Sequence, residues 1–179
     1  MEEFINVGKR IPKMDAEEKV TGKAVYIHDL KIPGMLYGKI LYSSHAHAKI
    51  KSIDTSKAEK LPGVKAVLTG YNIPPIKFGV YKDNVPLKAN KVCSLRDEIA
   101  AVAATDPDIA EEALHLIKVE YEILPAIFDP EEAMKEGAVL IHEEHVGGKE
   151  KKPTNVLNLP WRLIAGDVEE ARKNSAHVA

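Results

Sequence analysis

The sequence predicts an α+β domain in which short helices connect strands of a mixed sheet, and three neighbouring stretches carry this prediction. Residues 99–104 form an uncharged apolar run with the length of a strand buried on both faces. In residues 110–117, apolar side chains recur three and four positions apart, as on one side of a helix. Residues 119–123 then alternate apolar and charged side chains, which indicates a half-exposed strand.

Two Asp-Pro pairs mark where helices begin. Asp106 can accept a backbone N–H as the N-cap, and Pro107 suits the first helical position because its missing N–H would be unpaired there. Asp129 and Pro130 repeat the pattern after the half-exposed strand, with Glu132 at the capping-box spacing. We therefore expect a strand–helix–strand unit followed by a further helix.

An earlier part of the chain predicts a second strand–helix–strand unit over residues 37–69. Strands are expected at residues 35–43, where aromatic and branched residues concentrate, and from residue 48 to residue 53, where apolar residues alternate with lysine. Ser56 stands at capping-box spacing from a glutamate, so a helix is expected over residues 56–61. Residues 64–69 alternate as a strand.

Between the two units, residues 70–91 predict a long loop with one short strand near residues 78–81. Loops of this length inside a domain often form binding or contact surfaces. Further along, residues 137–142 predict a strand or an extended segment, and residues 143–155 a polar linker. A last helix is expected from Asp167 to about residue 173, again with capping-box spacing.

The expected domain organisation has four parts. Residues 1–19 form an N-terminal arm, residues 20–135 the main domain, residues 136–164 a linker or extended segment, and residues 165–179 the start of a truncated second domain. The final five residues read as the start of an apolar strand that has no partner in the chain, which favours a piece of a longer polypeptide. The alternative is that this strand docks on the existing sheet.

Composition limits the class of protein. Hydrophobic residues make up 45% and charged residues 29% of the chain, as in soluble globular proteins. No apolar run approaches the ~20 residues of a membrane-spanning helix, and no signal peptide is apparent, which favours a cytoplasmic protein. The single cysteine excludes an internal disulfide. The lysine-rich run at residues 149–152 fits a solvated linker better than a phosphate or nucleic-acid contact.

Two histidines could begin a metal site. His45 and His47 are two residues apart, which on a strand places both rings on one face. Two ligands are too few for a metal ion, and the other histidines have no matching spacing. Hydrogen-bonded structural histidines are therefore favoured, and a small zinc hydrolase built on this pair stays the minor alternative.

Other polar residues suggest no active site. Arg96, Asp97 and Glu98 precede the buried strand, where they could bind a ligand, although a structural or contact role is favoured. Cys93 could act as a nucleophile only beside a histidine brought in by the fold, so a small buried residue is favoured. Phosphate-binding glycine loops are absent. The residues alone therefore assign no catalytic, cofactor-binding or metal-binding position.

A set of short motifs gives a more specific indication. They comprise residues 22–26 with Asp29, residues 33–38, 43–50, 53–54, 61–64, 67–69, 111–116, 119–122 and 124–126. In this order they resemble the molybdenum-binding large subunit of the xanthine dehydrogenase and aldehyde oxidase family. The resemblance implies that residues 20–135 form that subunit's α/β hammerhead domain, and that residues 166–168 open its molybdopterin-binding domain.

One motif departs from the family's usual pattern. Arg96, Asp97 and Glu98 stand where xanthine dehydrogenases typically carry Gly-Glu-Pro, which resembles the hydroxybenzoyl-CoA reductase-like branch. The resemblance implies an oxidoreductase that hydroxylates, or in that branch reduces, a carbon centre with a molybdopterin cofactor. Iron–sulfur clusters and FAD are implied on partner subunits or domains. Neither nucleic acid nor a membrane is an expected partner.

The family's catalytic glutamate and pterin-binding segments lie downstream of the hammerhead domain, so the resemblance transfers no catalytic residue to this sequence. The chain is therefore expected to act as scaffold and interface, inactive alone, with exposed apolar surface near strand ends and around Trp161. The alternative is a self-contained, non-catalytic binding or assembly module that uses residues 70–91 and the Arg96 cluster.

Overall fold

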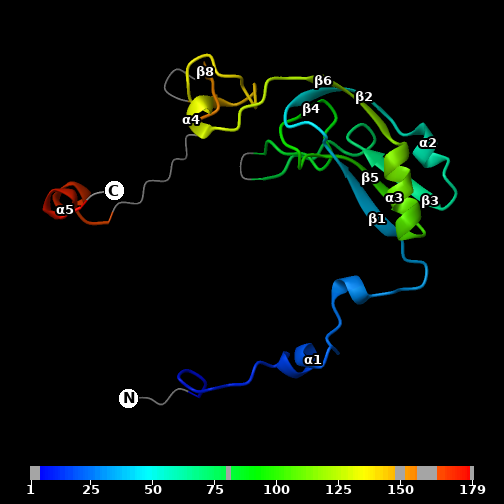
Figure 1. Cartoon of the computed structure of the whole chain (residues 1–179), viewed down its shortest axis with the longest axis horizontal. Helices are drawn as coiled ribbons and strands as arrows, with labels where there is room; N and C mark the ends of the chain where they lie inside the picture. The colour runs from blue at the N-terminus through cyan, green and yellow to red at the C-terminus, as the bar shows by residue number, and fades with distance from the viewer. Residues whose placement is uncertain (1–4, 80–81, 148–151, 157–164, 178–179) are drawn as a thin grey trace.

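The computed structural model describes residues 5–79, 82–147, 152–156 and 165–177. Figure 1 shows the strands and helices of the described residues between 37 and 123 gathered into one layered body, with an N-terminal arm leading into it. The elements, in chain order, are α1 (Ala16–Val20), the 3-10 helix η1 (Ile27–Asp29), β1 (Tyr37–Tyr42), β2 (Ala48–Asp54), α2 (Ser56–Glu59), β3 (Val64–Thr69), β4 (Lys91–Val92), β5 (Glu98–Ala104), α3 (Pro107–Leu116), β6 (Lys118–Ile123), α4 (Pro130–Ala133), β7 (Val146–Gly147), β8 (Lys152–Pro153) and α5 (Val168–Asn174).

The described strands form two three-stranded sheets, ordered β1-β5-β3 and β4-β2-β6, and a small β7-β8 ribbon. The α+β class is confirmed, but the single mixed sheet is wrong, because every pairing between these strands is antiparallel. The reason lies in the two helical crossings. Helix α2 takes the chain from β2 in one sheet to β3 in the other, and α3 takes it from β5 back to β6.

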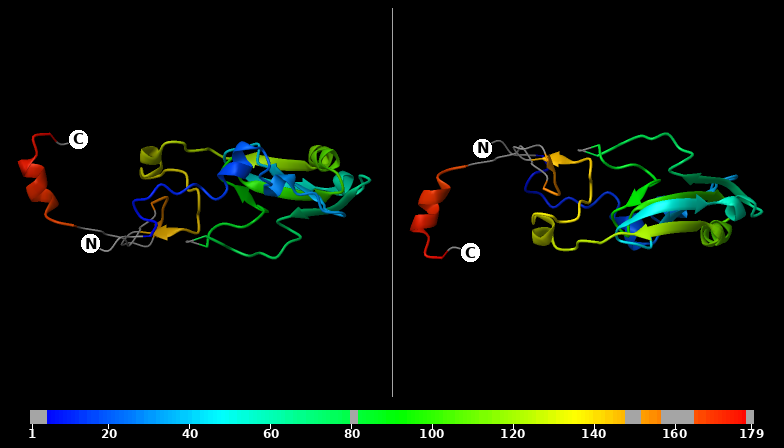
Figure 2. Two further views of the ribbon diagram at one scale, coloured as in Figure 1. Left: turned by 90° about the horizontal axis from the view of Figure 1, so that it is seen from below. Right: turned by 90° about the horizontal axis from the view of Figure 1, so that it is seen from above.

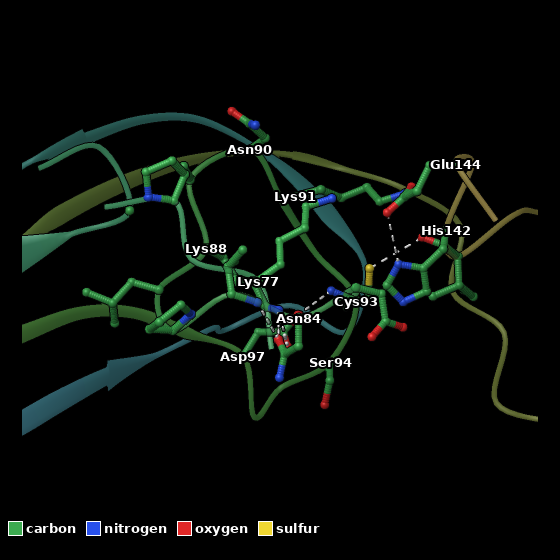
Figure 3. A pocket seen from close by; sticks show the side chains of 18 of the residues that line it. Lys77, Asn84, Lys88, Asn90, Lys91, Cys93, Ser94, Asp97, His142 and Glu144 are labelled. Atoms are coloured by element: carbon green, nitrogen blue, oxygen red, sulfur yellow. Dashed lines mark hydrogen bonds and ion pairs between the residues drawn. The ribbon is translucent and has the colours of Figure 1, made fainter. Parts of the chain in front are cut away.

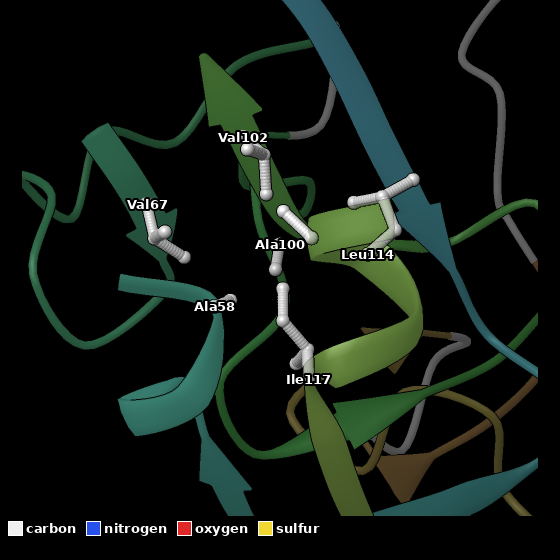
Figure 4. Close-up of a cluster of buried hydrophobic side chains, with 7 residues drawn as sticks. Ala58, Val67, Ala100, Val102, Leu114 and Ile117 are labelled. Carbon is white, nitrogen blue, oxygen red and sulfur yellow. The ribbon is translucent and has the colours of Figure 1, made fainter. Parts of the chain in front are cut away.

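The main core lies between the β1-β5-β3 sheet and the two helices α2 and α3. Figure 4 shows its side chains converging from strand and helix. Its buried members are Ala58, Val67, Ala100, Val102, Ala113, Leu114 and Ile117. A second buried cluster packs on the β4-β2-β6 sheet and consists of Ala48, Ile50, Val92 and Ile99. In both views of Figure 2, α3 and the long loop of residues 70–91 lie on opposite sides of the strands.

Helix starts follow the sequence closely. The Asp106 carboxylate accepts the Asp108 N–H at 2.8 Å, and Asp129 and Asp167 cap α4 and α5 in the same way. The Ser56 cap is wrong, because α2 begins at Ser56 itself and ends at Glu59 rather than at residue 61. The N-cap residue Thr55 makes no capping bond, and its Oγ1 donates to the Glu59 carboxylate at 2.6 Å. The Asp54 carboxylate accepts the Ser56 N–H at 3.0 Å instead.

Several short elements have no counterpart in the sequence prediction. Strand β4 and helix α1 are among them, and the expected linker of residues 143–155 contains β7 and β8. Residues 137–142 form no strand, and residues 70–91 contain only a single bridge between Phe78 and Asn84 in their described part. Strands of two residues have too little sequence for a periodicity, so only pairing reveals them.

Some expectations concern residues outside the described ranges. These are Trp161, most of the lysine-rich run at residues 149–152, and the last two residues of the expected terminal strand; residues 175–177 themselves form no strand. No helix within the described ranges is both long enough and apolar enough to cross a membrane.

Candidate functional site

The long loop of residues 70–91 encloses a cleft of about 970 Å³ together with residues 93–97 and 141–144. The loop returns on itself at Gly70, where an added Cβ would lie 2.7 Å from the Leu87 carbonyl oxygen. Backbone that close admits no side chain, so glycine is required here. The cleft therefore depends on a close approach at the loop's own base.

Asp97 connects several of the residues that line this cleft. Its carboxylate accepts the Cys93 N–H at 2.6 Å and lies 3.8 Å from the Lys88 ammonium. Lys88 also donates to the Asn84 side chain, and its backbone N–H donates to the Glu98 carbonyl at 2.7 Å. Figure 3 shows Asp97, Lys88 and Asn84 grouped together. These contacts agree with the structural interpretation of Asp97, which also lines the cleft.

The neighbouring Arg96 is exposed and bonds only through its backbone N–H, which donates to Ser94 Oγ at 3.1 Å. Glu98 is the first residue of β5 and half-buried. The three charges therefore do not form one binding group, because the chain turns between them. The sequence pattern does not single out Lys88 and Lys91. Both lie at the cleft because of the path of the loop, which no spacing in the sequence predicts.

The far side of the cleft is also charge-compensated. The Lys91 ammonium lies 3.1 Å from the Glu143 carboxylate. The His142 ring lies 3.6 Å from the Glu144 carboxylate. A hydrogen bond from the backbone N–H of Glu144, together with this ring, lowers the pKa of the Glu144 carboxyl. The Lys91 ammonium and the His142 ring thus each lie beside a carboxylate of the protein.

Cys93 lies between the two charged groups and is half-buried. Its sulfur is 3.5 Å from the Ile141 carbonyl oxygen. Burial raises the pKa of the Cys93 thiol above its ordinary value of 9.0, so the thiol stays protonated at neutral pH. A protonated thiol is a weak nucleophile, which agrees with a structural role.

His45 and His47 are not neighbours on a strand face. Both lie in the turn before β2, and they face different partners. The His47 ring is buried with its Nδ1 2.6 Å from the Pro125 carbonyl oxygen, whereas the His45 ring meets Tyr121 edge-on with centroids 4.8 Å apart. The shared face is therefore wrong. The His47 ring makes a hydrogen bond, as expected for a structural histidine, whereas the His45 ring makes an aromatic contact.

A metal site is not formed by the part of the chain that the structure describes. No group of three or more His, Cys, Asp or Glu side chains there is placed to hold an ion. His115 is exposed beside Glu111 at 3.9 Å, and His145 lies 3.4 Å from the Val156 carbonyl oxygen. Among these described residues the geometry defines a folded α+β scaffold with a charge-balanced cleft and no assembled catalytic group.

Comparison with known proteins gives the wider context. The family model "Aldehyde oxidase and xanthine dehydrogenase, a/b hammerhead domain" matches residues 21–125. A probable xanthine dehydrogenase subunit of Bacillus subtilis is 45% identical over 169 residues, which are 93% of this chain and 21% of that protein. The nicotinate dehydrogenase large molybdopterin subunit of Eubacterium barkeri is 40% identical, over 93% of this chain and 37% of that protein.

Solved structures agree. Quinoline 2-oxidoreductase from Pseudomonas putida 86 superimposes with a TM-score of 0.70 at 33% identity, covering 78% of this chain and 19% of that one. The chain thus belongs to the aldehyde oxidase and xanthine dehydrogenase hammerhead-domain family. It spans between about a fifth and two fifths of the length of the two curated relatives named above.

A molybdopterin cofactor carries a phosphate, which binds at uncompensated donors or at a glycine-rich turn at a helix start. None of the described residues that line the cleft belongs to a helix, so the cleft lacks a helix start. Lys88 and Lys91 lie near Asp97 and Glu143, and Lys49 and Lys77 also line the cleft. The cofactor and its chemistry are therefore not placed at these side chains.

Proposed function

We propose that this chain is the N-terminal part of the molybdenum-binding large subunit of a molybdenum hydroxylase-type oxidoreductase. In this role it is a scaffold and interface, and it is inactive alone. The observation that carries the proposal is the match of residues 21–125 to the hammerhead-domain family, within relatives several times longer than this chain. The ion pairs of Lys88 with Asp97 and of Lys91 with Glu143 are consistent with a scaffold role for the cleft.

The proposal includes a division of the chain. Residues 20–135 are the hammerhead domain, residues 136–164 connect it onward, and residues 165–179 begin the molybdopterin-binding domain. The start of α5, capped by Asp167, supports a new element there. Residues 1–19 are an arm that precedes the domain. Catalytic, cofactor-binding and metal-binding residues all belong to later parts of the subunit.

Cofactors and partners follow from the same proposal. The complete subunit binds molybdopterin, as the name of the E. barkeri relative describes for that protein. Electrons leave through iron–sulfur clusters and FAD on partner subunits or domains. The enzyme acts in the cytoplasm on a carbon centre. The Arg96, Asp97 and Glu98 variant favours the hydroxybenzoyl-CoA reductase-like branch as the guide to its substrate class.

The test begins with the gene. We expect the reading frame to continue for several hundred codons beyond Ala179, and the complete subunit to purify with about one molybdenum atom per chain. We expect residues 1–179 alone to purify without molybdenum. A stop codon directly after Ala179, or stoichiometric molybdenum held by residues 1–179, would contradict the proposal.

The second candidate is a self-contained binding or assembly module. The cleft under residues 70–91 favours it, because a cleft of about 970 Å³ is large enough for a ligand. The same sequencing separates the two, since a module predicts a gene that ends near Ala179 and a protein that binds its partner without any metal.

A further inference from the structure

One face of the β1-β5-β3 sheet carries apolar side chains that no described element covers. The ladders place Ile40 and Leu68 on either side of Ala101, and they place Gly38 and Ala66 on either side of Ala103. Alternation along β1 continues this row to Tyr42. We name these seven residues the open face: Gly38, Ile40, Tyr42, Ala66, Leu68, Ala101 and Ala103.

The open face is apolar and accessible. Ile40 is 42% exposed, Leu68 43% and Tyr42 51%. None of the seven side chains is charged, and one carboxylate borders the row, because the half-buried Glu98 is the ladder partner of Tyr42. Lys39, the charged neighbour on β1, points to the helical side, where its ammonium lies 2.9 Å from the Glu111 carboxylate of α3. Contiguous apolar surface of this kind typically marks a contact with another protein element.

The central strand, β5, is covered by described elements on one face only. The alternate residues Ala100, Val102 and Ala104 on β5 are at most 1% exposed beneath α2 and α3. The whole strand is nevertheless uncharged after Glu98, which is the composition of a strand covered on both faces. Ala101 and Ala103 are only half-buried. The outer face of β5 is therefore less buried than its uncharged sequence predicts.

The shape of the open face indicates the kind of element that fits. Two alanines lie along its centre, and the larger Ile40, Tyr42 and Leu68 rise on the edge strands. The small side chains at the centre allow another layer to approach at the ~10 Å spacing of packed layers. A helix or sheet with an apolar side can lie there without a charged partner.

We propose that the open face is the docking surface for the part of the large subunit that follows residue 179. The inference rests on the proposed function. The B. subtilis relative has only 21% of its length matched, so most of such a subunit lies outside residues 1–179. A neutral surface suits a permanent contact within one polypeptide, because interfaces between subunits that associate reversibly are more polar.

The test measures thiol labelling of Leu68→Cys in the complete subunit, read by peptide mass spectrometry so that other cysteines do not interfere. Glu112→Cys, at an exposed position on α3, is the matched control. We expect Leu68→Cys to label about tenfold more slowly, or slower still, than Glu112→Cys, because labelling there requires local opening of a packed contact. Tyr42→Cys repeats the measurement if Leu68→Cys fails to fold.

Equal labelling at the two positions in a complete subunit that contains molybdenum would overturn the docking surface and leave the proposed function intact. A reading frame that ends after Ala179 would overturn the proposed function itself. The 179-residue chain gives a third comparison. There Leu68→Cys should label as fast as Glu112→Cys at every protein concentration, and protection that grows with concentration would identify a second copy as the occupant and overturn the proposal.

Discussion

Asp97 shows how one carboxylate can organise a loop that has little regular structure. It bonds the Cys93 N–H and pairs with Lys88, and so ties the far end of the long loop to the start of β5. Both charged side chains are largely buried, at 17% and 13% exposed. A hydrogen bond to a charged group in such a place stabilises more than a surface pair does.

We expect Asp97→Ala to lower the free energy of unfolding by about 1–3 kcal/mol, because it leaves the Cys93 N–H without its acceptor and removes the carboxylate beside the Lys88 ammonium, which keeps its bond to Asn84. Asp97→Asn should cost less, since its amide oxygen can still accept the N–H. Urea unfolding followed by circular dichroism measures both. Arg96→Ala is the control and should change stability by less than about 0.5 kcal/mol. Equal losses for Arg96→Ala and Asp97→Ala would contradict the structural role.

At this scale the sequence predicts what is local. The caps by Asp106, Asp129 and Asp167 were predictable because each carboxylate bonds an N–H two or three residues away. The partners of Lys88 and His47 were not, because they meet through loop closure. His47 bonds a carbonyl oxygen 78 residues later in the chain, at Pro125.

At the scale of elements, one ion pair fastens α3 to the edge of its sheet. The Lys39 ammonium of β1 lies 2.9 Å from the Glu111 carboxylate of α3. The hydrogen bond and the charge of Lys39 lower the pKa of Glu111 below its ordinary value of 4.5. Both side chains are substantially exposed, so salt should screen the attraction.

The pair gives a pH-dependent prediction. A carboxyl with a lower pKa in the folded state stabilises the fold above its unfolded pKa, and this contribution is lost as pH falls through the folded value. Wild type should therefore be more stable than Glu111→Gln at pH 7, and the two should converge below about pH 4.5. Thermal unfolding across this range measures the difference, with Glu112→Gln as control. A gap that persists in acid would contradict the assignment.

Elements of six or more residues could be predicted from the sequence, because a periodic pattern of apolar residues needs several repeats to be recognised. Strands β1, β2, β3, β5 and β6 and helix α3 all lie where the pattern predicted them. Strands β4, β7 and β8 have two residues each and depend on a partner. Their positions are set by pairing, as between Lys91 of β4 and Lys49 of β2.

At the scale of the whole molecule, residues 5–36, which extend from the N-terminal arm into the first part of the expected hammerhead domain, stand apart from the core. No residue from 5 to 36 is buried, although the segment carries large apolar side chains such as Ile5, Met14 and Ile27. Figure 1 shows it leading away from the strands. Stability derives mainly from buried apolar surface, and this segment contributes none of that burial.

We expect deletion of residues 1–35 to shift the thermal midpoint of the 179-residue chain by less than about 2 °C, since a loss of 1 kcal/mol corresponds to about 2–4 °C in a protein of this size. Differential scanning calorimetry measures it. A fall of about 5 °C or more would show that residues 1–35 pack on the rest of the chain, and this would contradict our interpretation of the fold.

The arrangement of the two sheets was beyond the sequence. Both strand–helix–strand stretches were visible, but a periodicity does not say whether a helix returns the chain to its own sheet. Here α2 and α3 both deliver it to the other sheet, and all described pairings are antiparallel in consequence. Residues 99–104 form the middle strand of their sheet, but the predicted burial on both faces is met fully only on the side of α2 and α3, since Ala101 and Ala103 are half-buried.

That crossing pattern has a consequence for how the protein is made. Residues up to the long loop supply β1, β2 and β3, and residues after it supply β4, β5 and β6. The first half supplies β2, the middle strand of the β4-β2-β6 sheet, and the second half supplies β5, the middle strand of the β1-β5-β3 sheet. The edge strands of each sheet come from the other half. Within either half, no two of these strands are hydrogen-bonded together. A nascent chain leaving the ribosome therefore cannot form either sheet until the residues beyond the long loop emerge, and then both sheets become possible in close succession.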